Sequence, residues 1–177
     1  TIYACWPLDK KFYLSTGIGI IVVDADRYEI SDTWLIGNGG NPVKVNGFTG
    51  DAAFFYAATE QGLKILPRNS PNPADYANWQ TISGSNGLPA GPCQQVINLA
   101  GKIILQQQDQ LYIQQGSAWS LFYADGWPVV SISTSENKLL LCSRQGNGFS
   151  RVRILNADGS VARTLDNSAA VSFPRKA

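Results

Sequence analysis

The sequence repeats itself along its length, and this repeat constrains the fold more than any other feature. Phe12–Ile20 aligns with Phe55–Leu63 at a separation of 43 residues. Both segments contain an apolar strand, a Thr-x-x-Gly turn and a second apolar strand. A degenerate third copy, Ile103–Leu111, keeps the two strands but has lost the threonine and the glycine. The chain is therefore a repeat architecture and not a single sandwich.

Tryptophans form a second series, because Trp34, Trp79 and Trp119 follow one another at spacings of 45 and 40 residues. A period of about 40 to 45 residues is typical of four-stranded β-propeller blades. Glycine, asparagine and aspartate divide each copy into four short strands, as turns with positive φ require. We predict an all-β chain of about four blades with almost no helix. The predicted blades are residues 1–37, 43–83, 93–123 and 129–166, with the start of a further blade at 168–174.

Individual strands and packing residues follow from the same alignment. The first strand of the first blade is expected at Thr1–Ala4. In the second blade a turn is expected at Thr49–Asp51 and the fourth strand at Trp79–Ile82. The predicted repeat-packing residues are Trp34, Trp79, Trp119, Gly19 and Gly62.

Strand Ala52–Ala58 is apolar at successive positions, which antiparallel strands show only when both faces of the sheet are covered. Blades stacked face to face supply that cover. Propellers usually close at 4 to 8 blades, so four blades and a fraction predict part of a larger propeller. Closure of four blades alone, or association of two copies, stays open.

Charge and composition exclude several classes of function. The net charge is +1, without a basic run, so nucleic acid is not an expected partner. No run of apolar residues and glycine, Gly17–Val23 included, is long enough to span a membrane. Cys5, Cys93 and Cys142 share no short spacing and predict neither a disulfide framework nor a metal site. Cys142 is expected to be a buried small apolar residue, and no cofactor is expected.

Catalytic candidates are few. The chain has no histidine, which removes the usual base of a serine or cysteine nucleophile. Asp24 and Asp26 are a carboxylate pair of the kind that glycoside hydrolysis needs, but aspartates are also ordinary turn residues. Gly37–Asn41 has the composition of a phosphate-binding loop without a following helix, and we interpret it as a connection between blades. The chain is predicted not to be an enzyme.

Three aromatic residues lie outside the repeat register. Tyr76, Tyr123 and Trp127 are predicted in or beside the loops 67–78 and 123–128. Loops carried by a rigid scaffold are where binding residues concentrate. We expect these three side chains to contact a glycan or a partner protein.

Several segments, in this order and spacing, resemble the amino-terminal propeller of PorZ-type proteins of the Bacteroidetes type IX secretion system. The resemblance covers residues 11–125 clearly. It rests on Tyr13–Thr16, Gly19–Asp24, Glu29–Ile30, Asp32–Gly40, Val43–Asn46, Tyr56–Leu63, Asn72–Pro73, Tyr76, Asn78–Trp79 and Gly87–Pro89.

The resemblance implies a cell-surface protein with two propellers and a carboxy-terminal β-sandwich. It further implies action with the sortase PorU and with PorV and PorQ, and delivery of anionic lipopolysaccharide to secreted cargo. This sequence contains no second propeller and no carboxy-terminal sandwich, so functions housed there cannot be assigned to these residues.

Two other classes stay open. The periplasmic sensor propellers of hybrid two-component regulators also carry a tryptophan followed by Asn-Gly-Leu-Pro, and Trp79 with Asn86–Pro89 fits that pattern. However, that family usually has Trp-Ile-Gly before the repeat threonine, where this chain has Tyr13–Ser15 and Tyr56–Ala58. A polysaccharide-active propeller enzyme is the third class, and the missing histidine counts against it.

Overall fold

The computed structural model describes residues 1–166, which form four antiparallel sheets of four consecutive strands each. The first sheet contains β1 (Ile2–Leu8), β2 (Lys11–Thr16), β3 (Ile20–Asp24) and β4 (Glu29–Trp34), and the second contains β5 (Val45–Gly50), β6 (Phe54–Thr59), β7 (Gly62–Pro67) and β8 (Gln80–Ile82). The third contains β9 (Gln95–Leu99), β10 (Lys102–Gln107), β11 (Gln110–Gln115) and β12 (Ala118–Tyr123), and the fourth contains β13 (Val129–Ser135), β14 (Lys138–Arg144), β15 (Ser150–Leu155) and β16 (Val161–Asp166). The predicted all-β blade architecture is confirmed.

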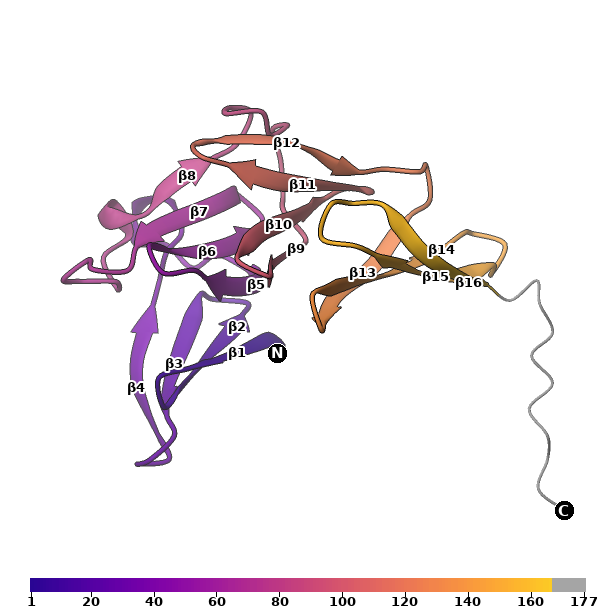
Figure 1. Ribbon diagram of the computed structural model, residues 1–177. Coiled ribbons are helices and arrows are strands. Elements are labelled where there is room, and N and C mark those ends of the chain that lie inside the picture. Colours follow the sequence, from indigo (N-terminus) through magenta and orange to yellow (C-terminus); the bar gives the residue numbers. More distant parts are fainter. Residues whose placement is uncertain (167–177) are drawn as a thin grey trace, which may run out of the picture.

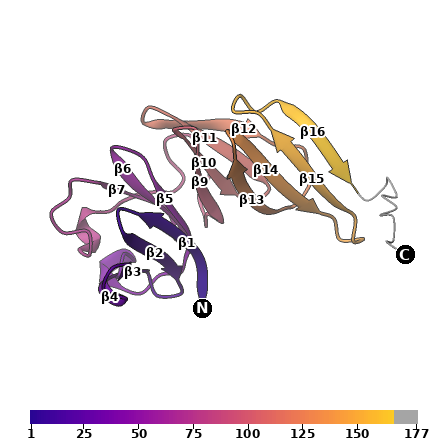
Figure 2. The ribbon, with the colours of Figure 1, turned by 60° about the horizontal axis from the view of Figure 1, so that its bottom comes forward.

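The four sheets follow one another around an open arc (Figure 1, Figure 2). The first strands of neighbouring sheets contact each other, so β1, β5, β9 and β13 lie along the inside of the arc. The helices of residues 1–166 are two short 3₁₀ turns, η1 (Asn38–Gly40) and η2 (Tyr76–Asn78). Neither has the length and apolar character needed to cross a membrane. The expected further blade at 168–174 lies outside the described residues.

Apolar side chains from neighbouring sheets form three cores, one at each junction. Strand β6 contributes to two of them, because Phe55 and Ala57 enter the core against the first sheet and Tyr56 and Ala58 the core against the third. Successive strand residues point to opposite faces, so a strand between two sheets must be apolar at every position. This explains the two-sided apolar pattern of the sequence.

The Thr-x-x-Gly motif closes the hairpin between the second and third strands of a sheet. The Thr16 hydroxyl donates a hydrogen bond to the Gly19 carbonyl (2.9 Å) and accepts one from the Ile18 N–H (3.3 Å). Thr59 makes the equivalent bonds in the second sheet, donating to Gly62 (2.7 Å). Gly19 has a φ of +146°, and a Cβ there would lie 2.1 Å from the Trp34 carbonyl oxygen. The repeat thus preserves a turn in which only glycine fits.

Some predicted boundaries are wrong. Strand β1 extends to Leu8, well beyond Ala4. The turn expected at Thr49–Asp51 begins later, because β5 continues through Gly50. The Asp51 carboxylate then accepts the N–H groups of Ala53 and Phe54 and so forms the turn. In the second sheet Trp79 precedes β8 instead of starting it.

The cysteines also depart in part from expectation. Cys142 is only half-buried, because it points away from the third sheet on the uncovered face of β14. Cys93 is the buried one, and burial raises the pKa of its thiol to about 12. Cys5 is exposed, and all three thiols are free.

We predict that Gly19→Ala lowers the free energy of unfolding by about 2 to 4 kcal/mol, because the new methyl group collides with fixed backbone at a strained φ. Gly17→Ala is the matched control in the same turn, since its nearest neighbour is the Tyr3 hydroxyl oxygen at 3.8 Å. Urea unfolding of the two variants measures the difference. Equal stabilities would contradict this account of the motif.

Candidate functional site

The three aromatic residues expected to contact a ligand do not lie together. Tyr76 is in η2, between β7 and β8, whereas Trp127 lies in the connection from β12 to β13. Figure 1 shows these two connections at opposite sides of the arc. Tyr123 is the last residue of β12 and so belongs to a strand instead of a loop. The structure therefore offers two separate places and not one aromatic site.

Tyr76 is held firmly while its side chain stays 44% exposed. The Asp75 carboxylate accepts the Ala77 N–H and so caps η2 (2.9 Å). The ring lies against Gly40 of η1, where an added Cβ would be 3.0 Å from the ring atom Cδ1. This arrangement presents a pre-oriented aromatic surface at the junction of the first two sheets.

Tyr123 and Trp127 belong to a charged cluster that joins the third and fourth sheets. Arg151 and Arg153 of β15 both form ion pairs with Asp125. The Arg151 guanidinium lies 3.9 Å from the centre of the Trp127 ring, and the Tyr123 hydroxyl donates to Asp125 (2.7 Å) and accepts from Arg153. Arg151 is only 7% exposed. Both aromatic residues thus have a structural role in addition to the predicted contact.

The ionisable groups weighed as catalysts are engaged in turns. The Asp24 carboxylate accepts hydrogen bonds from the backbone N–H groups of Arg27 and Asp26. These bonds, of which the one from Arg27 has the largest effect, hold the pKa of the carboxyl below its ordinary value. Asp26 forms an ion pair with Lys10 (2.8 Å). A general acid at neutral pH needs the opposite shift. Within residues 1–166, no group of three or more aspartate, glutamate, cysteine or histidine side chains is placed to hold a metal.

The repeat tryptophans are buried but not equivalent. Trp34 is the last residue of β4, Trp79 immediately precedes β8, and Trp119 is the second residue of β12. Trp34 and Trp79 share the core between the first and second sheets, with ring centres 6.2 Å apart. Trp119 lies in the next core. The regular spacing of 45 and 40 residues therefore does not mean that the three tryptophans occupy equivalent positions in their sheets.

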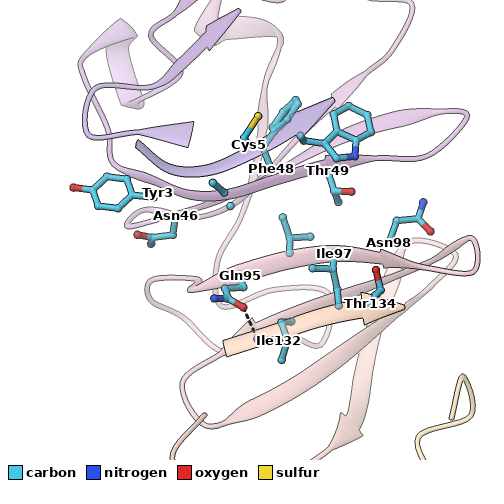
Figure 3. A pocket seen from close by; sticks show the side chains of 14 residues that line it. Tyr3, Cys5, Asn46, Phe48, Thr49, Gln95, Ile97, Asn98, Ile132 and Thr134 are labelled. Atoms are coloured by element: carbon cyan, nitrogen blue, oxygen red, sulfur yellow. Dashed lines mark hydrogen bonds between the residues drawn. The ribbon is translucent and has the colours of Figure 1, made fainter. Parts of the chain in front are cut away.

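A pocket of 310 Å³ lies on the inside of the arc, and we call it the axial pocket. Each first strand contributes to its lining, with Tyr3 from β1, Asn46 from β5, Gln95 from β9 and Thr134 from β13. Figure 3 shows Asn46 and Gln95 facing each other across this space. Among the described residues that line it, the ionisable groups are the Tyr3 phenol and the Cys5 thiol. The axial pocket is thus suited to holding neutral groups.

Amide side chains of the axial pocket also tie the sheets together. Asn46 donates to the Cys93 carbonyl (2.8 Å), and Asn98 donates to the Gly50 carbonyl (2.9 Å). Gln95 accepts the Ile132 N–H of the fourth sheet (2.7 Å), the bond drawn in Figure 3. Sequence reasoning missed these residues. Polar side chains inside otherwise apolar first strands were the available signal.

Comparison with known families supports the resemblance given by the motifs. The model of the PorZ N-terminal β-propeller domain of the type IX secretion system matches residues 1–80. No curated protein matches the sequence. The resemblance to the PorZ amino-terminal propeller is thereby confirmed.

Solved structures show the same fold. PorZ from Porphyromonas gingivalis, described as an essential bacterial surface component of the type IX secretion system, superposes with a TM-score of 0.72 at 18% identity, over 93% of this chain and 21% of its own. The extracellular domain of a protein named as a hybrid two-component system of B. thetaiotaomicron gives 0.67 at 15% identity, over 90% and 21%. A second such domain from the same organism gives 0.64 at 13% identity, over 90% and 23%. The chain spans about a fifth of the length of these proteins, and likeness at this identity shows the fold alone.

We predict that Asp125→Ala lowers the free energy of unfolding by about 3 kcal/mol, because it leaves two poorly exposed guanidinium groups without their carboxylate. Asp26→Ala is the matched control, since it breaks an exposed ion pair that contributes less than about 1 kcal/mol. Denaturant unfolding of both variants tests this. Similar small losses in the two proteins would show that the cluster does not hold the fourth sheet.

Proposed function

From the match of residues 1–80 to the PorZ amino-terminal propeller, we propose that this chain is a non-catalytic binding and scaffolding module of a type IX secretion system accessory protein. In this proposal the module works outside the cytoplasm, at the cell surface. The family match is the observation that carries the proposal. The structural likeness to PorZ along 93% of the chain agrees with it.

The uncovered outer sheets support a role inside a longer chain. Phe12 and Ile30 of the first sheet are exposed, as are Val161 and Leu165 of the fourth. In a propeller each of these sheets has a neighbour on both faces. We propose that other domains of a longer chain cover them. The further proposed partners are PorU, PorV and PorQ-like secretion proteins and lipopolysaccharide or another glycan.

The chemistry of the described residues supports binding more than catalysis. The axial pocket is lined by amides, hydroxyl groups and apolar side chains. The carboxylates Asp24, Asp26 and Asp125 are committed to turns or ion pairs. The amides and hydroxyl groups of the pocket can orient a ligand, whereas the carboxylates are poorly placed to transfer protons to it.

A ligand-sensing propeller of a hybrid two-component regulator is the second candidate. The two extracellular domains from B. thetaiotaomicron favour it, as does Trp79 followed by Asn86–Pro89. No observation among the described residues favours the third class, a polysaccharide-active enzyme.

Deletion of the gene in the organism that carries it separates the two candidates. The proposal predicts that proteins secreted by the type IX system lose their attachment at the cell surface and appear in the medium, as measured by proteomics of both fractions. Reintroduction of the intact gene is the control. Normal attachment of these proteins would contradict the proposal, and altered transcription of other genes in the deletion strain would then favour the sensor.

The aromatic contact residues Tyr76, Tyr123 and Trp127 remain a proposal within this function. Tyr76 offers the cleaner test, because Tyr123 and Trp127 also support the charged cluster. We predict that Tyr76→Ala weakens binding to lipopolysaccharide from the parent organism about 5- to 10-fold, as loss of an aromatic contact does. Tyr28→Ala is the control, since Tyr28 is 90% exposed in a hairpin turn. Biolayer interferometry gives both affinities, and equal values would remove Tyr76 from the contact surface.

A further inference from the structure

The axial pocket is bordered by the edges of strands. The first strand of each sheet, β1, β5, β9 or β13, stands at one end of the order of its sheet. Its inner edge is therefore paired with no described strand, and such an edge carries backbone N–H and C=O groups that can bind another chain. Neighbouring first strands contact one another but belong to separate sheets. The space at the axis thus has main-chain hydrogen-bonding groups around it.

Two amide side chains of the axial pocket have their orientation fixed by backbone partners. The Nδ2 atom of Asn46 donates to the Cys93 carbonyl (2.8 Å), which leaves its Oδ1 atom as an acceptor. The Oε1 atom of Gln95 accepts the Ile132 N–H (2.7 Å), which leaves its Nε2 atom as a donor. Neither of these remaining atoms forms a hydrogen bond with another described residue. The pocket therefore offers one free acceptor and one free donor.

Both amides are accessible from the axial pocket. Asn46 and Gln95 are half-buried, and Figure 3 shows them facing each other across this space of 310 Å³. Thr134 is exposed at the same pocket, and Tyr3 is 44% exposed. The volume lies at the lower end of the usual range for ligand sites. A short ligand can therefore meet both amides in the arrangement that the structure shows.

A peptide group matches this pair of amides. The N–H and the C=O of a trans peptide bond point in opposite directions, so a chain that passes between Asn46 and Gln95 can donate to one and accept from the other. The strand edges around the pocket offer further main-chain groups of the same kind. Extended peptides bind at sheet edges through such main-chain hydrogen bonds.

The rest of the lining defines the side chains that such a peptide carries. The ionisable groups among the described lining residues, the Tyr3 phenol and the Cys5 thiol, are neutral at pH 7, so no charge is available to pair with an acidic or basic side chain. Phe48, Ile97 and Ile132 give the pocket apolar walls. Small uncharged side chains therefore fit this lining best.

We propose that the axial pocket binds a short extended segment of a partner protein with small uncharged side chains. One peptide N–H of this segment donates to Oδ1 of Asn46, and one peptide carbonyl accepts from Nε2 of Gln95. The apolar walls hold the side chains on either side of that peptide group. The assignment rests on the pocket alone, and it holds whether the chain serves a secretion system or a sensor.

A library of acetylated and amidated hexapeptides built from glycine, alanine, serine, threonine and valine tests the proposal on the full-length protein. Affinity selection followed by isothermal calorimetry should identify peptides with dissociation constants of about 100 μM. N-methylation of a bound peptide at the amide that Asn46 accepts should weaken binding about 5- to 10-fold, because it removes the donor. No binding of any peptide at about 2 mM would overturn the proposal. Equal binding of the parent peptide and of every N-methylated form would also overturn it.

Gln95→Glu tests the free donor in the protein. The variant keeps the oxygen that accepts the Ile132 N–H but replaces Nε2 with a second oxygen, so we expect peptide binding to weaken about tenfold. Gln94→Glu is the matched control, because it makes the same change of charge at a half-buried neighbour that lines a different pocket. The Oε1 atom of Gln94 likewise accepts a backbone N–H, that of Gln108 (2.7 Å). Equal affinities of the two variants would show that the peptide does not meet Gln95.

Asn46→Ala tests the free acceptor, and we expect it to weaken peptide binding about fivefold. Asn98→Ala is its control and should bind nearly as the parent does. Asn98 lines the same pocket, but its amide donates to the Gly50 carbonyl (2.9 Å) and accepts the Gly101 N–H (2.8 Å), so both ends are occupied. A loss from Asn98→Ala as large as that from Asn46→Ala would contradict the proposal, because general loosening of the strands would then explain both.

Discussion

The fold depends on the packing of one sheet face against the next. Each four-stranded sheet is too small to bury its apolar residues alone, so the neighbouring sheet completes the core. Strand β10 shows this, because Ile103 and Leu105 enter the core shared with the second sheet and Ile104 enters the core shared with the fourth. The inner sheets are thereby covered twice, whereas the outer sheets keep one face that no described residue covers.

The sequence predicted this architecture because the repeat and its turns are local. The bonds of Thr16 and Thr59 lie within single hairpins, and the close approach at Gly19 allows no side chain, so the pattern is visible as Thr-x-x-Gly. Strand limits were less predictable. A turn residue such as Gly50 can also lie in a strand, and only the N–H groups that the Asp51 carboxylate accepts show where the turn begins.

The sites were less predictable than the fold, because they join residues far apart in the chain. Asp125 meets Arg151 and Arg153 across 26 and 28 positions, and no local pattern marks that meeting. The tryptophan spacing was visible, but it could not reveal that Trp34 and Trp79 share one core. Nor could it reveal that the Trp119 indole N–H has no acceptor within residues 1–166, since this depends on what the facing sheet provides.

The three junctions use different chemistry although the sheets are repeats. The first is aromatic, where Trp6, Tyr13, Phe48 and Phe55 lie with ring centres 5.3 to 6.2 Å apart. The second is mostly aliphatic, with Tyr56, Tyr112 and Trp119 among its members, and it has a pocket of 280 Å³ between its two sheets. The third adds an ion-pair cluster at its edge. In a repeat protein the stability is roughly a sum over units and their junctions. The residues of one junction can therefore change while the neighbouring junctions keep the whole array folded. The second junction shows this, because it tolerates a pocket and a buried Trp119 N–H without an acceptor among the described residues.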